Sequence, residues 1–397
     1  MDITIHPRLL AGSIAAVPSK SQAHRFLILA AFADAPTEIV CSRRGRDLDA
    51  TAECLRALGA GIVFENSRYR VTPIGEIPEK AALFCGESGS TLRFLLPVAG
   101  ALGVDATFHL EGRLPERPLS PLWEELERMG CSLSRPEPDS VRIQGQLLPG
   151  DYSIRGDVSS QFVTGLLLGL SLLNRESTLT LTEPVESMPY IRMTADAMKR
   201  FGAPCVFSDG VFTVRPAVFH TSGHVHVEGD WSSGAFWLAA KILDSNLRIT
   251  GLDKASAQGD RAVLRHLVGL EEFRIIDCAN IPDLVPVLAV VAGARKGAKF
   301  VGAGRLRLKE SDRLESTAAM LRALGGKAEV EEDTLTVEGT GFTGGTVDAC
   351  GDHRIAMAAA IAATVCHEPV KILGAEAVEK SYPDFWTHYK RLGGIVR

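Results

Sequence analysis

Basic side chains recur in this chain next to serine, glycine and aspartate, at places where a short strand would turn into a helix. The basic residues of this kind are Lys20, Arg25, Arg93, Arg117, Lys309, Arg313, Arg354 and Lys380. Guanidinium and ammonium groups bind phosphate and carboxylate oxygens, and a helix N-terminus offers backbone N–H groups to the same anions. The pattern therefore favours a small polyanionic substrate.

One charged run adds a carboxylate to these cations. The segment Leu306–Arg313 reads LRLKESDR and lies between two apolar segments. A loop or helix start that carries Lys309, Glu310 and Arg313 resembles a group for proton transfer and anion binding more than a solvated surface.

A plainer explanation exists for each residue taken singly. A serine, threonine or aspartate before a helix is most often only an N-cap, and an isolated lysine or arginine is most often solvated. Arg25, Arg93 and Arg354 argue against this explanation, because we expect them in the first turns of apolar helices. The helix dipole disfavours a cation there, so an anionic group is expected to compensate.

The elements that position these residues repeat along the chain. Six times a short strand passes through a polar corner into a long apolar helix, with landmarks at Ser21, Ser90, Ser160, Ser233, Asp283 and Arg354. The landmarks lie about 70 residues apart, with one interval of about 50, which indicates a repeated supersecondary unit.

A second series of amphipathic helices runs in step with the first. Each of these helices ends at a glycine, namely Gly59, Gly130, Gly202, Gly269, Gly325 and Gly393. Glycine accepts the left-handed conformation just past a helix, and strand-like runs such as GIVFE and KAEVE follow most of the six. Each unit thus predicts one interior and one peripheral helix.

Six such units are too many for one core, so we expect α/β architecture in two domains of three units each. The expected boundaries give a first domain over residues 18–228 and a second over residues 229–397, which also takes the N-terminal strand of residues 1–17.

Composition is that of an ordinary globular chain. The chain has 397 residues, of which 46% are hydrophobic and 23% charged, and its net charge of −5 disfavours a general nucleic-acid-binding surface. The apolar stretches near Phe162–Leu173 and Leu284–Ala294 are too short to span a bilayer. With no signal-peptide pattern and eight scattered cysteines, we expect a cytoplasmic protein with reduced thiols, bound to neither nucleic acid nor membrane. We also expect a monomer.

The corner motifs together resemble those of the 5-enolpyruvylshikimate-3-phosphate (EPSP) synthases over essentially the whole chain. In order, they are Lys20-Ser21 with Arg25, Gly86–Arg93 (GESGSTLR), Glu116-Arg117-Pro118, Ser159-Ser160-Gln161, Ser187 with Pro189-Tyr190, Ile281-Pro282-Asp283, Lys309–Arg313 (KESDR), Asp352-His353-Arg354, and Lys380 with Pro383-Asp384. KESDR, VSSQ and GDHR in combination are highly specific.

The resemblance implies the enolpyruvyl-transferase fold, an inside-out α/β barrel in which two similar domains each contain three βαβαββ repeats around buried helices and close on the substrates. It also implies transfer of the enolpyruvyl group of phosphoenolpyruvate to the 5-hydroxyl of shikimate 3-phosphate, with release of phosphate, on the route to chorismate and aromatic amino acids. No metal or organic cofactor is implied. Glyphosate is the inhibitor that competes with phosphoenolpyruvate in this family.

The resemblance also implies roles for individual residues. Ser21, Arg25, Ser159, Ser160 and Ser187 would bind shikimate 3-phosphate, and Lys20 and Gln161 would contact both substrates. Arg117, Arg313, Arg354, Lys380 and the backbone of Gly89 would bind phosphoenolpyruvate.

For catalysis, the resemblance implies that Asp283 is the base at the 5-hydroxyl, with Lys309 beside it; both would contact shikimate 3-phosphate. Glu310 would handle the proton at the methylene carbon, and Lys20 would act with them.

Three positions depart from the family pattern. Glu87 stands where asparagine is usual, Phe94 where proline is common, and Arg305 where an asparagine contact is expected.

Two alternatives accompany this interpretation. The first is the sister family that transfers enolpyruvate to UDP-N-acetylglucosamine, which has a lysine-asparagine pair at the first corner and a reactive loop cysteine. Here the pair is Lys20-Ser21, and no cysteine lies between Leu110 and Leu119. The second is a non-catalytic anion-binding relative, which loss of Asp283, Lys309 or Glu310 would favour; all three are present.

Overall fold

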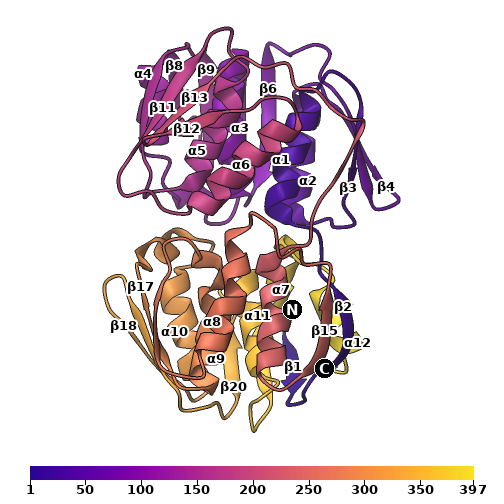
Figure 1. The fold of residues 1–397 in the computed structure, drawn as a ribbon, viewed down its shortest axis with the longest axis vertical. Coiled ribbons are helices and arrows are strands. Elements are labelled where there is room, and N and C mark those ends of the chain that lie inside the picture. The colour runs from indigo at the N-terminus through magenta and orange to yellow at the C-terminus, as the bar shows by residue number, and fades with distance from the viewer. The chain divides into compact units, whose positions relative to one another are not determined.

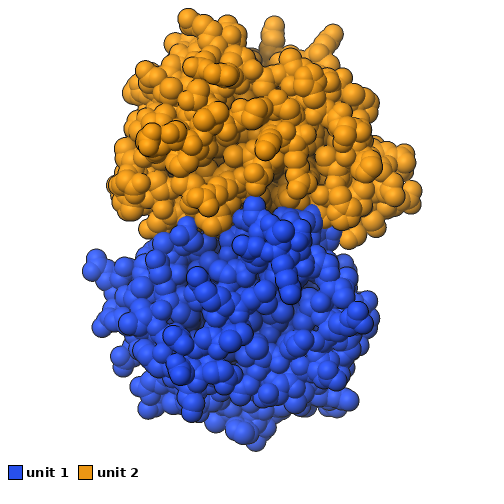
Figure 2. Space-filling model, in the orientation of Figure 1, with its two compact units in different colours: residues 1–19, 228–397 blue, residues 20–227 orange.

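The computed structural model describes all residues from Met1 to Arg397. The chain forms two compact units, which Figure 2 colours separately: unit 1 comprises residues 1–19 and 228–397, and unit 2 comprises residues 20–227. The expected domain boundaries, after residues 17 and 228, stay a prediction.

Unit 2 contains three repeats of one plan, in which two helices alternate with strands and an antiparallel hairpin closes the repeat. The first has α1 (Lys20–Ala31), β3 (Thr37–Val40), α2 (Arg46–Ala57), β4 (Gly61–Glu65) and β5 (Arg68–Thr72). The second has β6 (Lys80–Gly86), α3 (Gly89–Leu102), β7 (Asp105–Leu110), the 3₁₀ helix η1 (Leu114–Glu116), α4 (Leu122–Arg128), β8 (Cys131–Ser134) and β9 (Ser140–Gly145). The third has β10 (Asp151–Arg155), α5 (Ser160–Leu170), β11 (Ser177–Thr182), α6 (Met188–Arg200), β12 (Val206–Ser208) and β13 (Val211–Val214), and β14 (His224–His226) pairs back with β3.

Unit 1 follows the same plan with one shorter repeat. Its first repeat has β2 (Ala11–Ala15), α7 (Trp231–Ile242), β15 (Asn246–Thr250), η2 (Gly259–Ala262) and α8 (Val263–Gly269). Its second has β16 (Arg274–Asp277), η3 (Pro282–Leu284), α9 (Val285–Ala294), β17 (Ala298–Val301), η4 (Gly304–Leu308), α10 (Arg313–Ala323), β18 (Lys327–Val330) and β19 (Leu335–Glu338). Its third has β20 (Gly345–Asp348), α11 (His353–Ala362), β21 (Val370–Leu373), η5 (Ala375–Lys380), α12 (Phe385–Arg391) and β22 (Ile395–Val396), and β1 (Ile3–His6) lies between β21 and β22.

Both helix series predicted from the sequence are confirmed, and α1, α3, α5, α7, α9 and α11 are the interior helices. Five of the six helix-ending glycines have a positive φ, from 74° at Gly202 to 106° at Gly59. The expectation for Gly269 is wrong, because this glycine is the last residue of α8 and Leu270 follows as the C-cap.

The repeat that holds α7 and α8 lacks the antiparallel strand pair that follows the second helix in the other five repeats. Four of these pairs are hairpins, β4–β5, β8–β9, β12–β13 and β18–β19, and in the fifth β22 pairs with β1. By contrast, α8 ends at Gly269 and β16 begins at Arg274. β15 and β2 accordingly form a two-stranded sheet, whereas the other five sheets have four strands each. This shorter repeat explains the single interval of about 50 residues in the sequence period.

The helices α3 and α5 lie side by side in unit 2 (Figure 1), and small residues let them approach closely. A Cβ added to Gly165 would overlap the carbonyl oxygen of Arg93, and one added to Gly169 would lie 2.8 Å from that of Pro97. The contacts advance by four residues on both helices, so the helices run parallel and their N-termini share one end of the unit. No helix in the structure has the length and apolar character needed to cross a membrane.

We expect Gly165→Ala to lower the free energy of unfolding by about 1–3 kcal/mol, because the added methyl group forces two packed helices apart. Chemical denaturation followed by circular dichroism measures the change. Gly75→Ala is the matched control, since a Cβ there meets nothing within 4 Å. Equal stability of the two variants would contradict the close approach of α3 and α5.

Candidate active site

Unit 1 places its predicted site residues at the ends of helices. Asp283 lies in η3, Lys309 and Glu310 lie between η4 and α10, and Lys380 ends η5. Arg313 and Arg354 lie in the first turns of α10 and α11. These two helices begin at aspartate N-caps, which fix the arginines at the same end of the unit: Asp312 accepts a hydrogen bond from the N–H of Glu315 and Asp352 from that of Arg354.

Asp283 lies between cations. Arg313 Nη1 donates to its Oδ1 over 2.9 Å, Arg354 Nη2 donates to its Oδ2 over 2.8 Å, and the Lys309 Nζ lies 3.8 Å from Oδ1. Burial alone would raise the pKa of this carboxyl, but Arg354, Lys309 and Arg313 together hold the pKa well below its usual range. Asp283 is therefore ionised, with a side chain that is still 21% exposed.

Arg313 is the buried centre of this cluster. Its side chain is only 1% exposed, and besides Asp283 it donates to Glu310 over 2.5 Å and to Asp352 over 2.9 Å. Burial lowers the pKa of a guanidinium, but the three carboxylates outweigh this effect and raise the pKa of Arg313. Any anionic ligand of Arg313 must therefore compete with carboxylates of the protein.

Lys309 has an unusual protonation equilibrium. Burial lowers the pKa of its ammonium group to about 8, and Arg305 and Arg313 act in the same direction against the carboxylate of Asp283. Arg305, which departs from the family pattern, thus acts on Lys309 through its charge.

Lys380 is the last residue of η5, which packs against α11, the helix that carries Arg354. Its side chain is buried.

In unit 2, Gly89 opens α3 with two guanidinium groups beside it. A Cβ added to Gly89 would lie 2.5 Å from Arg93 Nη1 and 2.8 Å from Arg117 Nη1. Glycine is needed here because a side chain would displace both cations. The carboxylate of Glu87 lies against Gly112, in the loop that follows β7.

Gln161 joins the starts of α3 and α5. Its Oε1 accepts from Arg93 Nη1 over 3.1 Å, and its Nε2 donates to Ser90 Oγ over 2.9 Å. Ser159 caps α5 by accepting from the N–H of Gln161, and Ser160 is the first residue of the helix. The close packing of α3 and α5 thus brings the polar groups of two corners together.

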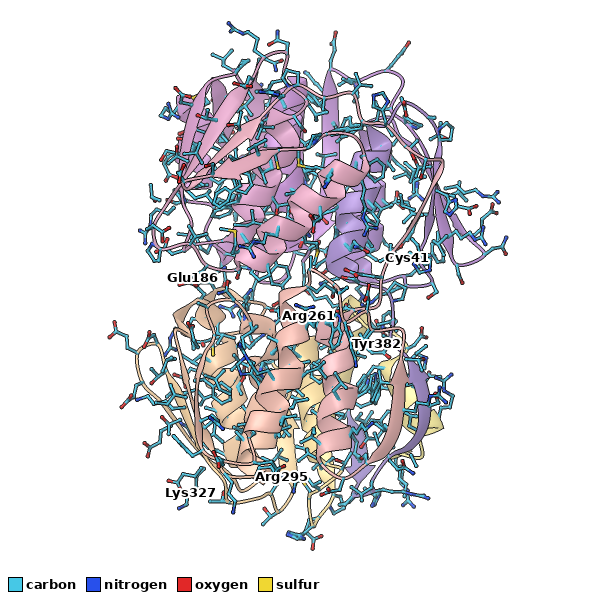
Figure 3. The ribbon with its side chains drawn as sticks, viewed as in Figure 1. Cys41, Glu186, Arg261, Arg295, Lys327 and Tyr382 are labelled. Atoms are coloured by element: carbon cyan, nitrogen blue, oxygen red, sulfur yellow. The ribbon has the colours of Figure 1, made fainter.

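Lys20 opens α1 and forms an ion pair of 2.6 Å with Asp47 of α2. Ser21 follows it, and the Ser21 carbonyl oxygen accepts from Arg25 Nη1. Ser187 is the N-cap of α6 and has a φ of 54°. Glu186, which is labelled in Figure 3, precedes it in the chain.

Arg25 is deeply buried, and its hydrogen-bond partners are neutral. It donates to the hydroxyls of Thr194 and Thr164 and to the carbonyl oxygen of Tyr190, and its guanidinium lies 5.0 Å from the ring centroid of Phe94. Burial lowers the pKa of Arg25 from its ordinary value. We expected an anionic group to compensate the charge of each arginine in these first turns. Arg354 has such a partner in Asp283, whereas Arg25 is held by neutral hydrogen-bond acceptors instead.

For three polar residues next to the predicted site, the family resemblance implied no individual role. Arg93 contacts Gln161, Asp47 pairs with Lys20, and Asp352 binds Arg313. Arg93 and Asp352 lie within the GESGSTLR and DHR motifs, so their position was a usable signal. Asp47 belongs to no motif noted in the sequence.

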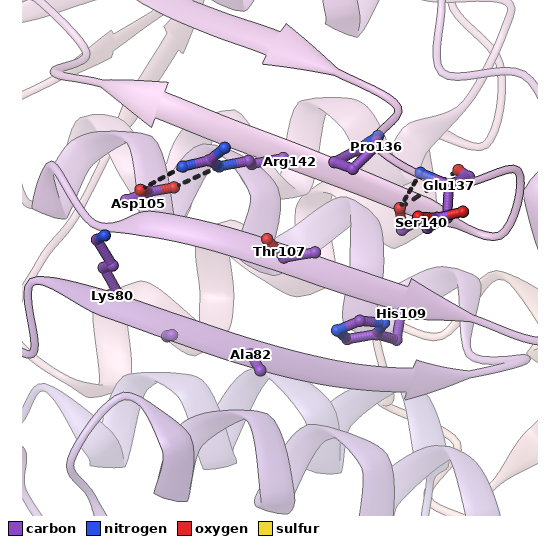
Figure 4. Close-up of a pocket in the computed structure, with 10 residues that line it drawn as sticks. Lys80, Ala82, Asp105, Thr107, His109, Pro136, Glu137, Ser140 and Arg142 are labelled. Atoms are coloured by element: carbon purple, nitrogen blue, oxygen red, sulfur yellow. Dashed lines mark hydrogen bonds and ion pairs between the residues drawn. The ribbon is translucent and has the colours of Figure 1, made fainter.

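A separate surface hollow lies on the sheet of β6, β7, β9 and β8 (Figure 4), with a volume of about 490 Å³. Its charged lining includes Lys80 and the bidentate pair of Arg142 and Asp105. It contains none of the predicted site residues. No group of three or more histidine, cysteine, aspartate or glutamate side chains is placed to hold a metal ion.

Comparisons with known proteins agree with the fold and with these motifs. Residues 6–389 match the family model of EPSP synthase (3-phosphoshikimate 1-carboxyvinyltransferase). The 3-phosphoshikimate 1-carboxyvinyltransferase of Clostridium kluyveri is 38% identical over 99% of this chain and 98% of the relative. EPSP synthase from Acinetobacter baumannii superposes with a TM-score of 0.82 at 23% identity, covering 100% of this chain and 99% of that one.

A more distant structural neighbour is the enolpyruvyl transferase NikO from Streptomyces tendae, with a TM-score of 0.78 at 18% identity over 100% of this chain and 98% of that one. The repeated α/β units with cationic helix starts thus define an enolpyruvyl-transferase fold, as the sequence predicted. Within that class, the chain belongs to the EPSP synthase family.

We expect Asp352→Asn to lower the free energy of unfolding by about 3 kcal/mol, because breaking a buried ion pair costs about 3–5 kcal/mol and two carboxylates still face Arg313. Asp384→Asn is the control, since Asp384 is also the N-cap of a unit 1 helix but is exposed and makes no capping hydrogen bond. Denaturant titration of both variants measures the difference. A loss for Asp352→Asn no larger than that for Asp384→Asn would contradict the central role of this pair.

Proposed function

We propose that this chain is a 3-phosphoshikimate 1-carboxyvinyltransferase, which transfers the enolpyruvyl group of phosphoenolpyruvate to the 5-hydroxyl of shikimate 3-phosphate and releases phosphate. The observation that carries the proposal is the arrangement of Asp283 and Glu310 around Arg313, with Arg354 and Lys309 on Asp283. This arrangement combines two carboxylates that can transfer protons with cations that can bind the anionic substrates. Addition to an enol ether and the following elimination both need these two kinds of group.

In the addition step, the 5-hydroxyl oxygen attacks C2 of phosphoenolpyruvate while Asp283 takes the hydroxyl proton, and protonated Glu310 gives its proton to C3, which becomes a methyl group. In the elimination step, the C2–phosphate oxygen bond breaks, the phosphate leaves with the proton held by Asp283, and Glu310 takes a proton back from the methyl group. Lys309 and Lys20 stabilise negative charge during these steps.

Substrate binding would activate the base. With Arg313 and Arg354 on its carboxylate, Asp283 is a weak base, because the cations hold its pKa low. A phosphate or carboxylate bound to the same guanidinium groups offsets their charge and raises the pKa of Asp283. The anion also competes with Glu310 for Arg313. This competition frees the carboxylates of Asp283 and Glu310 for proton transfer.

The remaining roles follow the family pattern. Phosphoenolpyruvate is bound by Lys20, the Gly89 backbone, Arg117, Gln161, Arg313, Arg354 and Lys380. Shikimate 3-phosphate is bound by Lys20, Ser21, Arg25, Ser159, Ser160, Gln161, Ser187, Asp283 and Lys309. The enzyme acts without a metal or organic cofactor, as a monomer in the cytoplasm.

A phosphate-release assay tests the proposal directly. Purified protein is given phosphoenolpyruvate with either shikimate 3-phosphate or UDP-N-acetylglucosamine as acceptor. Phosphate release with shikimate 3-phosphate but not with UDP-N-acetylglucosamine supports the proposal. Release only with the nucleotide sugar would assign the sister reaction, and release with neither would leave an anion-binding protein.

Asp283→Asn tests the base. We expect kcat to fall by about 10²–10⁴-fold, because an amide cannot take the hydroxyl proton, while the Kd for shikimate 3-phosphate changes little. Stopped-flow turnover and isothermal titration calorimetry measure the two quantities. Asp277→Asn, at an exposed aspartate of β16, is the control. A kcat within tenfold of the unmodified enzyme would remove Asp283 from this role.

The pH profile tests Lys309. The ammonium group is lost as the pH rises through about 8 in the free enzyme, so kcat/KM for phosphoenolpyruvate should fall above that pH. Bound anions favour the ammonium and raise its pKa, so kcat should stay constant to higher pH. Lys309→Arg keeps its charge throughout and should lose this alkaline limb. Persistence of the limb in Lys309→Arg would show that another group causes it.

A further inference from the structure

His24 is a fully buried titratable residue with no part in the chemistry described so far. It lies on α1, one turn after Lys20, and its side chain is 0% exposed. Its Nδ1 lies 2.7 Å from Thr51 Oγ1 on α2, which in turn lies 2.7 Å from Thr91 Oγ1 on α3. Thr91 Oγ1 donates over 2.7 Å to Ser88 Oγ. One line of hydrogen bonds thus crosses three helices.

The donor and acceptor of each hydrogen bond in this line follow from the bonds made by Thr91, near its end. The hydroxyl of Thr91 donates to Ser88 Oγ and lies 3.4 Å from the carbonyl oxygen of Asp47, which can only accept. Because a hydroxyl group has one proton, Thr91 must accept a hydrogen bond from Thr51. Thr51 thus donates its proton to Thr91 and can only accept from His24, so Nδ1 of His24 carries a proton. The other ring nitrogen, Nε2, is buried without a hydrogen-bond partner, which suits an unprotonated nitrogen.

The surroundings keep the ring neutral. Burial lowers the pKa of His24 to about 3, and the cations Lys20, Arg25 and Arg43 act in the same direction against Asp47. The ring plane stands at 88° to that of Phe94, with centroids 6.3 Å apart. Phe94, another departure from the family pattern, thus helps to enclose the imidazole.

Ser88, where this series of hydrogen bonds ends, directly precedes Gly89 of the predicted phosphoenolpyruvate site. It caps α3 by accepting from the N–H of Thr91 over 3.2 Å, and Gly89 follows it directly. Gly89 has the guanidinium groups of Arg93 and Arg117 against it. A shift of the Ser88 side chain would therefore move the backbone on which two cations rest.

We propose that His24 is a positioning residue for the phosphoenolpyruvate site: as a neutral Nδ1–H donor it fixes, through Thr51 and Thr91, the Ser88 cap and the backbone of Gly89. The kinetic part of this inference rests on the proposed function. Its structural part does not, because it concerns the order of residues 86–91 in the protein without ligand.

Two pairs of variants test the line, and each pair contains a matched rescue. His24→Leu and Thr51→Val each remove one link, whereas His24→Asn keeps a donor at the place of Nδ1 and Thr51→Ser keeps the hydroxyl. We expect His24→Leu and Thr51→Val to raise KM for phosphoenolpyruvate by about tenfold, with kcat and KM for shikimate 3-phosphate within about threefold of the unmodified enzyme. His24→Asn and Thr51→Ser should stay within about threefold throughout. His367→Leu, at an exposed histidine of unit 1, is the control.

Hydrogen exchange gives a readout that needs no turnover. In His24→Leu and Thr51→Val, the amides of residues 86–91 should exchange about tenfold faster, with other segments of unit 2 unchanged. If His24→Leu does not fold, the Thr51 pair decides alone. Equal rises in both KM values, unchanged exchange at residues 86–91, or no rescue by His24→Asn and Thr51→Ser would overturn the proposal. An inactive unmodified enzyme with the expected exchange pattern would instead reject the proposed function and leave the positioning role standing.

Discussion

A buried charge that loses its ionic partner strongly destabilises a fold, and Arg313, buried against three carboxylates, is the side chain of unit 1 on which this constraint falls most heavily. Asp352 satisfies two of its nitrogens from the N-cap of α11, and Asp283 and Glu310 complete the ring from two other corners. One buried cation therefore fixes the relative positions of three segments that are distant in the sequence. Arg354 depends on the same arrangement, because Asp352 also accepts its backbone N–H.

In unit 2, the polar residues at the helix starts are held mainly by neutral hydrogen-bonding groups and by close contacts between backbones. Arg25 rests among threonine hydroxyls and carbonyl oxygens, and the corner of α3 rests on the line from His24 to Ser88. Gly165 brings α5 against α3, so that Gln161 reaches Arg93. The corners of this unit are therefore held mainly by packing and neutral hydrogen bonds, which leaves the cations Arg93 and Arg117 beside Gly89.

The sequence predicted what depends on local pattern and on motifs. The two helix series follow from apolar periodicity and from glycines such as Gly59 and Gly325, and the corner motifs indicate the family. Contacts between corners could not be read in this way. The pairing of Lys20 with Asp47 joins residues 27 positions apart, and that of Arg313 with Asp352 joins residues 39 apart. Nothing in either segment specifies which distant side chain it will meet. The short interval before Asp283 was visible, but only the strand pairing shows that a hairpin is missing there.

Ion pairs of this kind have a consequence for the reaction that neutral contacts would not have. The same guanidinium groups that bind the carboxylates of unit 1 also hold the pKa of Asp283 low, so under the proposed mechanism Asp283 is a poor base without ligand. In that mechanism, a ligand with phosphate and carboxylate groups replaces the protein carboxylates at the guanidinium groups and raises the pKa of Asp283. Had Asp283 been held by hydroxyl and amide groups instead, its pKa would respond much less to an arriving anion. The proposed coupling between substrate binding and base activation therefore follows from the choice of arginine as the buried partner.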